Sequence, residues 1–244
     1  SMLTFLFAGA LSVVLFLSGG EGVQSVYSSF GNQVPIYSVE TEEKAVSITF
    51  DTAWGCEDIP AVLDALQTAN CKATFFITGD WADKFPESVK LIFDAGHEVA
   101  NHGNAHEHFS SLSKQQMADS ISLCDDKIRA ITGQSEILFR APYGEYNEIL
   151  LNVCKETDRY IIQWSKDSLD YKGLSAEEMK KRILPKLRNG DIILFHTGTE
   201  QTASALPEIL EEIKNCGYSF KTVGELILKD NFKLDNEGRQ FSSM

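Results

Sequence analysis

Positive charge is scarce in this chain, whose 244 residues include 22 Lys and Arg side chains against 35 Asp and Glu, giving a formal net charge of −13. A broadly acidic surface repels phosphate backbones and anionic lipid head groups. Nucleic acid and anionic membranes are therefore disfavoured as main partners, whereas catalysis on a neutral or cationic substrate stays open.

Cysteine is also sparse. The five cysteines are Cys56, Cys71, Cys124, Cys154 and Cys216, and they include no C-x-x-C pair. An odd number without paired spacing fits neither a disulfide framework nor a cysteine zinc cluster. Cys71, Cys124 and Cys154 stand among apolar neighbours, so we expect them to be small core residues.

One long apolar run is present near the start of the chain. Residues 2–17 (MLTFLFAGALSVVLFL) carry no charge, so residues 1–20 are predicted to be a signal peptide or a membrane anchor. No Lys or Arg precedes the run and no Ala-x-Ala cleavage site follows it, which slightly favours an anchor. A buried N-terminal helix is the alternative. Both membrane-related interpretations predict an extracytoplasmic domain, secreted or membrane-anchored, and residues 21–33 are interpreted as a linker.

Beyond the linker, short apolar segments alternate with helical ones, without sequence repeats. This alternation predicts βαβ units and a mainly parallel sheet. About seven such units favour a barrel over an open sheet, so we expect one α/β domain over residues 34–230 and a frayed polar tail over 231–244. The expected strands are 34–40, 45–51, 72–77, 97–101, 137–141, 159–164, 191–196 and 218–221, and the expected helices are 58–69, 81–95, 114–132, 145–157, 175–188, 203–216 and 222–229.

Polar side chains follow five of the expected strands, at the point where each strand ends. They are Asp51; His102 and His106; Arg140; Asp167 and Asp170; and His196. In a parallel barrel these positions meet on one face. Five converging polar sites are hard to explain by packing, although each one alone has a structural interpretation.

Two of these residues have the spacing of metal ligands. His102 and His106 are four residues apart, which on a helical turn would place them on one face about 6 Å apart along the axis. Two imidazole nitrogens could then reach one metal ion. A pair of capping or surface histidines is the alternative.

The remaining polar residues suggest proton transfer. Asp170 is available to orient His196 and to raise its pKa, as a general acid requires, although a lone histidine there can also be a satisfied core residue. Arg140 is the only cation at these strand ends, and pairing with Asp51 would keep that carboxylate ionised as a base. A purely structural ion pair is compatible with this role.

A possible oxyanion site follows Arg140. Pro142 fixes the backbone, and Tyr143 then presents an N–H that could meet an oxyanion.

Taken together, these residues resemble the five motifs of the polysaccharide deacetylases, carbohydrate esterases that share the NodB homology domain. The family motifs T-F-D-D, H-[ST]-x-x-x-H, R-x-P-Y, D-x-x-D-W and L-x-H are met in order by Thr49-Phe50-Asp51-Thr52, His102-Gly103-Asn104-Ala105-His106, Arg140-Ala141-Pro142-Tyr143, Asp167-Ser168-Leu169-Asp170-Tyr171 and Leu194-Phe195-His196. The match runs from about residue 34 to residue 228. The segment FDTAWGCED and the apolar N-terminal run look most like the sporulation-associated, PdaB-like branch.

The resemblance implies a distorted (β/α) barrel that hydrolyses N-acetyl groups from amino sugars of cell-wall or spore-wall glycan. It also implies a divalent metal, zinc or similar, and a role for each matching residue. The implied roles are Asp51 as general base, His196 as general acid oriented by Asp170, Arg140 as the partner of the base, His102 and His106 as metal ligands, Tyr143 as oxyanion donor, and Leu194 and Tyr171 as the lining of the acetyl pocket.

One departure bears on activity, because Thr52 stands where the family has a second, metal-binding acid. A neutral hydroxyl is a weak ligand, so weak or partial metal occupancy is expected. Three outcomes are open: a weaker metal site completed by water or Asp51, metal-free catalysis, or an inactive domain that still binds glycan. Gly103 for Ser or Thr and Tyr171 for Trp are milder departures.

Two rival functions follow from these observations. The first is a non-catalytic glycan-binding or wall-organising module, and the second is a metal-dependent amidase acting on a small molecule. An open groove with exposed aromatic residues would favour a glycan, and a closed pocket would favour a small molecule.

Overall fold

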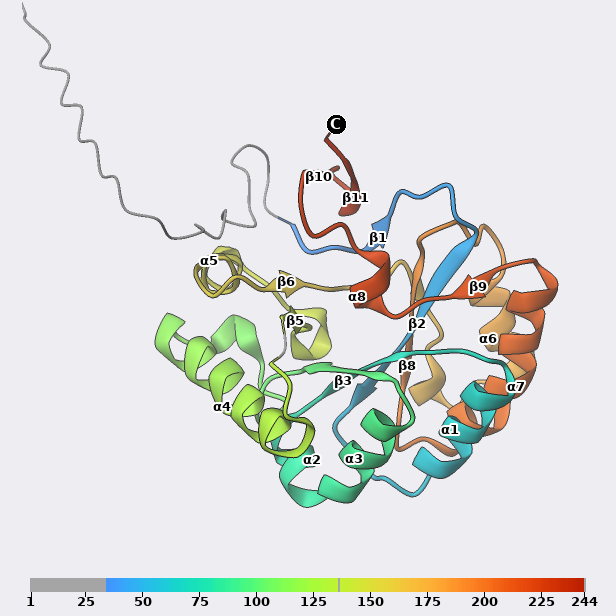
Figure 1. Ribbon diagram of the computed structural model, residues 1–244, viewed down its shortest axis with the longest axis horizontal. Coiled ribbons are helices and arrows are strands. Elements are labelled where there is room, and N and C mark those ends of the chain that lie inside the picture. The colour runs from blue at the N-terminus through green and yellow to red at the C-terminus, as the bar shows by residue number, and fades with distance from the viewer. Residues whose placement is uncertain (1–33, 136, 244) are drawn as a thin grey trace, which may run out of the picture.

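The computed structural model describes residues 34–135 and 137–243 and contains an eight-stranded sheet (Figure 1). Seven strands follow the order β6-β5-β4-β3-β2-β8-β7, and β9 pairs with β2 off this path. Every pairing in this sheet is parallel. Its strands are β2 (Ala45–Thr52), β3 (Thr74–Ile77), β4 (Glu98–Asn101), β5 (Leu138–Phe139), β6 (Tyr160–Ile161), β7 (Lys166–Asp167), β8 (Ile192–His196) and β9 (Ser219–Phe220).

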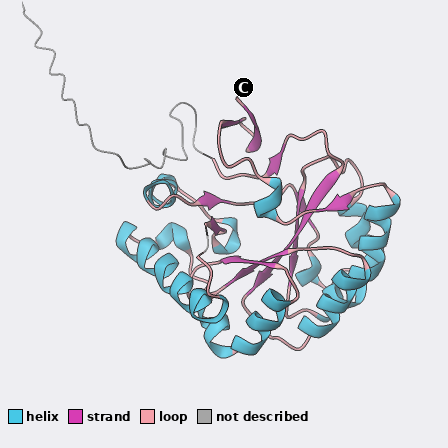
Figure 2. Cartoon of the chain, in the orientation of Figure 1, coloured by secondary structure: helices cyan, strands magenta, loops and turns pink. Residues whose placement is uncertain are grey.

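Helices connect these strands and cover the outside of the sheet (Figure 2). The α-helices are α1 (Ile59–Thr68), α2 (Gly79–Lys84), α3 (Pro86–Asp94), α4 (Lys114–Thr132), α5 (Glu148–Glu156), α6 (Ala176–Ile183), α7 (Glu200–Asn215) and α8 (Val223–Leu226). The described residues also form three short 3-10 helices, η1 (Phe109–Ser111), η2 (Pro142–Gly144) and η3 (Asp170–Lys172). None of the described helices is long and apolar enough to cross a membrane. The predicted signal peptide or anchor and the linker lie outside the described residues.

The sheet curls but does not close into a full barrel. β6 and β7 stand at opposite ends of the strand order, and no ladder joins them in the described part of the chain. The result is a half-barrel with helices around it, which confirms the predicted distorted (β/α) barrel.

Both faces of the sheet are packed. Every residue of β2 is buried, and the ring of Phe50 stacks on that of Phe75 with centroids 4.7 Å apart, on the face covered by α1, α3 and α7. Phe76 points to the opposite face, where a second apolar cluster fills the inside of the curl beneath α8. Strands buried on both faces are typical of parallel sheets, which is why these segments are continuous apolar runs in the sequence.

Two helical predictions differ in outcome. The capping box expected at Ser175 is confirmed, since Ser175 and Glu178 cap the start of α6 reciprocally. The single helix expected over residues 81–95 is instead two, α2 and α3, divided at Phe85. Pro86 has no N–H to continue the first helix, but it is well suited to begin the second.

The expectation of a frayed C-terminal tail is wrong. β10 (Phe232–Leu234) and β11 (Arg239–Ser242) form an antiparallel hairpin, and β11 pairs in parallel with β1 (Ser38–Val39). Gln240 is fully buried, and its side-chain amide both donates to Leu228 O and accepts from Leu228 N–H, at 2.6 and 2.7 Å. The polar tail is thus ordered by backbone pairing, which hydrophobic patterning does not reveal.

Candidate active site

The register of the parallel strands gathers the polar strand ends at one edge of the sheet. Asp51 on β2 is the direct partner of His196 on β8. Asn101 on β4 pairs with Phe139 on β5, so the residues that follow, His102 and Arg140, also come together. The predicted convergence therefore follows from strand pairing.

Asp51 is held as a buried anion. Its Oδ1 accepts a hydrogen bond from Arg140 Nη1 at 2.7 Å. Arg140 is fully buried and also donates to Thr49 Oγ1 and to the carbonyls of Ile162 and Gln163. Burial raises the pKa of Asp51, but the electrostatic effects of the neighbouring His102 ring and Arg140 guanidinium outweigh it and bring the pKa below its usual value. Asp51 is therefore ionised at neutral pH.

His102 directs a free lone pair at the second oxygen of Asp51. Its Nδ1 lies 2.8 Å from the carbonyl of Arg140, which can only accept, so the proton is on Nδ1. Nε2 is then unprotonated, lies 3.5 Å from Asp51 Oδ2 and has no hydrogen-bond partner among the residues described. Burial lowers the pKa of His102 and keeps the ring neutral.

The two histidines meet through a loop, so the helical turn expected for them is wrong. Residues 102–108 form no helix, and Gly103 and His106 both adopt positive φ, +77° and +55°. A side chain at Gly103 would also collide with Phe109, since its Cβ would lie 2.8 Å from the ring. The rings of His102 and His106 nevertheless lie 5.2 Å apart, and burial lowers the pKa of His106 to about 4.

These residues fit a tightly bound metal ion poorly. The free lone pair of buried His102 Nε2 is suited to ligation, and His106 lies beside it. In the described ranges, however, no three His, Cys, Asp or Glu side chains are grouped to hold an ion. Thr52, at the family's acid position, is fully buried and its hydroxyl has no hydrogen-bond partner there. Two imidazoles alone hold a divalent ion weakly.

His196 is oriented by Asp170, as predicted from the sequence. The ring Nδ1–H donates to Asp170 Oδ1 at 2.7 Å, and the backbone N–H of His196 donates to Oδ2 at the same distance. Burial of the ring opposes its charge, but the hydrogen bond to Asp170 and the negative charges of Asp51 and Asp170 prevail and raise the pKa of His196. Because Nδ1 of His196 is engaged by Asp170, Nε2 is the ring nitrogen that can act on a substrate in the cavity.

Tyr143 combines an exposed ring with an unused backbone donor. Its φ of +61° is in the left-handed region, within η2. Tyr143 is 55% exposed, and its ring stacks on His108 with centroids 4.1 Å apart and meets the edge of His106 at 4.6 Å. No described residue accepts a hydrogen bond from the Tyr143 N–H. A substrate carbonyl oxygen could therefore use this donor.

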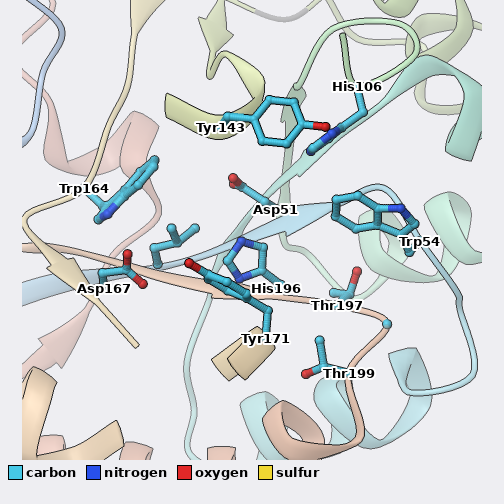
Figure 3. A pocket seen from close by; sticks show the side chains of 12 residues that line it. Asp51, Trp54, His106, Tyr143, Trp164, Asp167, Tyr171, His196, Thr197 and Thr199 are labelled. Atoms are coloured by element: carbon cyan, nitrogen blue, oxygen red, sulfur yellow. The ribbon is translucent and has the colours of Figure 1, made fainter. Parts of the chain in front are cut away.

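A cavity of about 480 Å³ lies over these groups (Figure 3). It is lined by Asp51, Trp54, His106, Tyr143, Trp164, Asp167, Tyr171, Leu194, His196, Thr197, Gly198 and Thr199. His102, Arg140 and Asp170 do not line it; they are fully buried behind Asp51 and His196. All nine residues expected at the site are thus brought together, six on the cavity wall and three behind it.

Sequence reasoning missed part of the wall. Trp54 and Trp164 flank the cavity, and Thr197 and Thr199 lie below it (Figure 3). The two tryptophans follow β2 and β6 by a few residues, so proximity to the polar strand ends was the available signal. Thr197 and Thr199 follow His196 at the end of β8, so the same signal was available for them.

Comparisons with known proteins show which proteins this chain resembles. A family model described as polysaccharide deacetylase matches residues 38–162. The uncharacterised protein YlxY of Bacillus subtilis is 30% identical over 79% of this chain and 60% of its own length. A peptidoglycan-N-acetylglucosamine deacetylase of Bacillus cereus is 33% identical over 78% of this chain and 92% of its own length. The chain therefore spans about 60% of the first relative but almost all of the second.

A solved structure shares the fold. Wild-type BA3943 of Bacillus anthracis, described as a CE4 family pseudoenzyme, has a TM-score of 0.76 and 30% sequence identity to this chain. The superposition covers 80% of this chain and 69% of that protein.

Proposed function

The chain belongs to the polysaccharide deacetylase family, and from this we propose that it hydrolyses N-acetyl groups on amino sugars of cell-wall or spore-wall glycan. The observation that carries the proposal is an ionised carboxylate, Asp51, directly across the strand pairing from a histidine with a raised pKa, His196. Both line one cavity. A base and an acid with pKa values pushed apart are what amide hydrolysis requires.

The residues present can carry out both proton transfers. Asp51 Oδ2 accepts the proton of a water molecule as its oxygen attacks the acetamide carbonyl carbon. The Tyr143 N–H donates to the oxyanion that forms. His196 Nε2–H then protonates the nitrogen as the C–N bond breaks, releasing acetate and a free amine. Arg140 keeps Asp51 ionised, and Asp170 holds the His196 ring in place.

The cavity walls suit a sugar. Trp54, Tyr143 and Tyr171 are each more than half exposed, and their rings provide apolar faces against which a pyranose can pack. Leu194 and Tyr171 would line the acetyl pocket, as predicted. Exposed aromatic residues around an accessible cavity favour a glycan over the small molecule of the amidase alternative.

The proposal also covers metal binding, the branch of the family and the cellular location of the protein. His102 and His106 would hold a divalent ion weakly, and no step above is routed through one. We place the protein outside the cytosol, secreted or membrane-anchored, because its deacetylase relatives act on cell-wall peptidoglycan according to their names. A sporulation-associated, PdaB-like role remains a prediction from the segment FDTAWGCED.

The second candidate is a catalytically weak glycan-binding module. The observations that favour it are Thr52 at the acid position and the likeness to a pseudoenzyme. Acetate release from N-acetylglucosamine oligomers separates the two candidates.

We expect the wild type to release acetate, and Asp51→Asn and His196→Ala each to lower the rate by about 10²–10⁴-fold. Both variants should still fold, and His196→Ala should keep the thermal unfolding midpoint almost unchanged. Asp51→Asn should lower the midpoint, because buried Arg140 loses its counter-charge. Oligomer binding without acetate release would favour the second candidate. Undiminished release by either variant would contradict the mechanism.

A further inference from the structure

The carboxylate that orients His196 has a further hydrogen-bond partner at the start of α7. Thr202, in the first turn of α7, is fully buried, and its hydroxyl lies 2.5 Å from Asp170 Oδ2. A carboxylate oxygen here only accepts, so the Thr202 hydroxyl donates. Thr202 is not among the residues that line the cavity.

The direction of the next hydrogen bond follows. Thr199 Oγ1 lies 2.5 Å from Thr202 Oγ1 and also accepts the backbone N–H of Thr202 as the N-cap of α7. Because Thr202 uses its only hydroxyl proton for Asp170, Thr199 must be the donor between the two hydroxyls. A chain of donors thus runs from Thr199 through Thr202 to Asp170.

Asp170 is fully buried, and both its oxygens are engaged. Oδ1 accepts from the His196 ring and from the backbone N–H of Tyr171, at 2.7 and 2.9 Å. Oδ2 accepts from the backbone N–H of His196 and from Thr202. Of these donors, the Thr202 hydroxyl is the only side chain other than the imidazole. It limits how much of the carboxylate's negative charge acts on the ring.

We propose that Thr202 is a positioning residue for the proton donor of this site, acting through Asp170, and that Thr199 orients its hydroxyl. The inference rests on the proposed function, because it concerns the group that protonates the leaving amine. It assigns a catalytic consequence to the start of α7, an element that carries none of the five family motifs.

The test separates this role from simple packing. Thr202→Val keeps the shape of the side chain but removes the donor, whereas Thr202→Ser keeps the donor. When the Thr202 hydroxyl is removed, the buried Asp170 carboxylate loses one hydrogen-bond donor. More of its negative charge then acts on the imidazole proton, so the pKa of His196 should rise by about one unit. Charged and titratable groups near the ring are otherwise unchanged. They are Asp51 on β2, Asp167 on β7, Asp170 and Tyr171 on η3, and His102 and His106 after β4.

The pKa of His196 is read by NMR titration of its ring protons. The chain has five histidines, and comparison with His196→Gln assigns the signal. We expect an upward shift in Thr202→Val, the wild-type titration in Thr202→Ser, and a several-fold fall in kcat with little change in KM for Thr202→Val. Thr132→Val is the matched control, because Thr132 donates to a backbone carbonyl on α4, away from the cavity.

Identical titrations of wild type and Thr202→Val would overturn the inference, and so would an equal shift in Thr132→Val. If Thr202→Val fails to fold, Thr202→Ala removes the same donor without placing a methyl group against the carboxylate. Because the titration needs no turnover, a wild type that releases no acetate would refute the proposed function while leaving the test of Thr202 readable.

Discussion

The two side chains that end β2 differ in whether they have hydrogen-bond partners. Asp51 is paired with Arg140 and faces His102, whereas the neighbouring Thr52 hydroxyl is buried with no hydrogen-bond partner among the described residues. A buried hydroxyl without a partner costs free energy, so this position is not optimised for stability. At this strand end, Thr52 affects the binding of a metal ion and Asp51 affects proton transfer.

Thr52→Asp should strengthen zinc binding. The added carboxylate supplies the anionic oxygen that a hydroxyl lacks, so we expect the Kd for zinc to fall by at least tenfold, equivalent to about 1.4 kcal/mol. Calorimetric titration at one pH and ionic strength measures it. Thr52→Asn is the matched control, because it has the same shape without the charge. A wild type that binds zinc as tightly as Thr52→Asp would show that another residue completes the site.

The pH dependence of hydrolysis should reflect His196. The general acid must be protonated, and its raised pKa keeps it so above the usual value of 6.5, so the rate should fall only as pH rises through that higher pKa. Asp170→Asn removes the charge that raises it, and should move this alkaline limb down by about one to three pH units. Profiles of kcat against pH test this expectation, and coincident alkaline limbs would contradict it.

Different secondary-structure elements position different residues of this site. The strands set the positions of Asp51 and His196 through their register, while the loop after β4 brings in His106 and the start of α7 brings in Thr202. The C-terminal hairpin supports the fold. Its strand β11 pairs with β1, and the Gln240 amide holds the backbone of Leu228, just after α8.

Gln240→Ala should therefore destabilise the fold. It leaves the N–H and the carbonyl of Leu228 without their partners, so we expect the free energy of unfolding to drop by about 1–3 kcal/mol. Urea denaturation measures this loss. Glu237→Ala, at an exposed position of the same hairpin, should have almost no effect. Equal stabilities of Gln240→Ala and wild type would mean that the hairpin is not anchored as described.

At the scale of the whole molecule, charge and the cavity act together. The chain carries a net charge of −13, and Asp51 and Asp167 lie on the cavity wall. No Lys or Arg is among the lining residues, and buried Arg140 is committed to Asp51 and backbone carbonyls. Apart from protonated His196, which serves as the general acid, no described lining residue is a cation that could receive an anionic substituent.

Neutral glycans should be preferred over carboxylated ones. One unit charge about 4 Å from another in water contributes about 1 kcal/mol, so kcat/KM for a carboxylated oligomer should be about fivefold lower than for a neutral one. The difference should shrink at high salt and in Asp167→Asn. Rates for both oligomers at two ionic strengths provide the measurement. Equal rates at low salt would contradict this view of the cavity.

The sequence by itself predicted the parallel α/β architecture and nine residues that the fold brings together at one cavity. Hydrophobic periodicity is a local property, and family motifs are contiguous, so both can be read without knowing the fold. Asp51, His196 and Arg140 were identifiable because each directly follows an apolar strand that the register aligns with its neighbours.

Only the tertiary structure decided which residues act from a distance. Thr202 meets Asp170 across 32 positions of sequence, and Gln240 meets Leu228 through an amide whose partners are backbone atoms. The loop that joins His102 and His106 depends on a glycine with positive φ rather than on a helical turn. Such contacts depend on how separate elements pack and on backbone dihedral angles, and neither leaves a periodic pattern in the sequence.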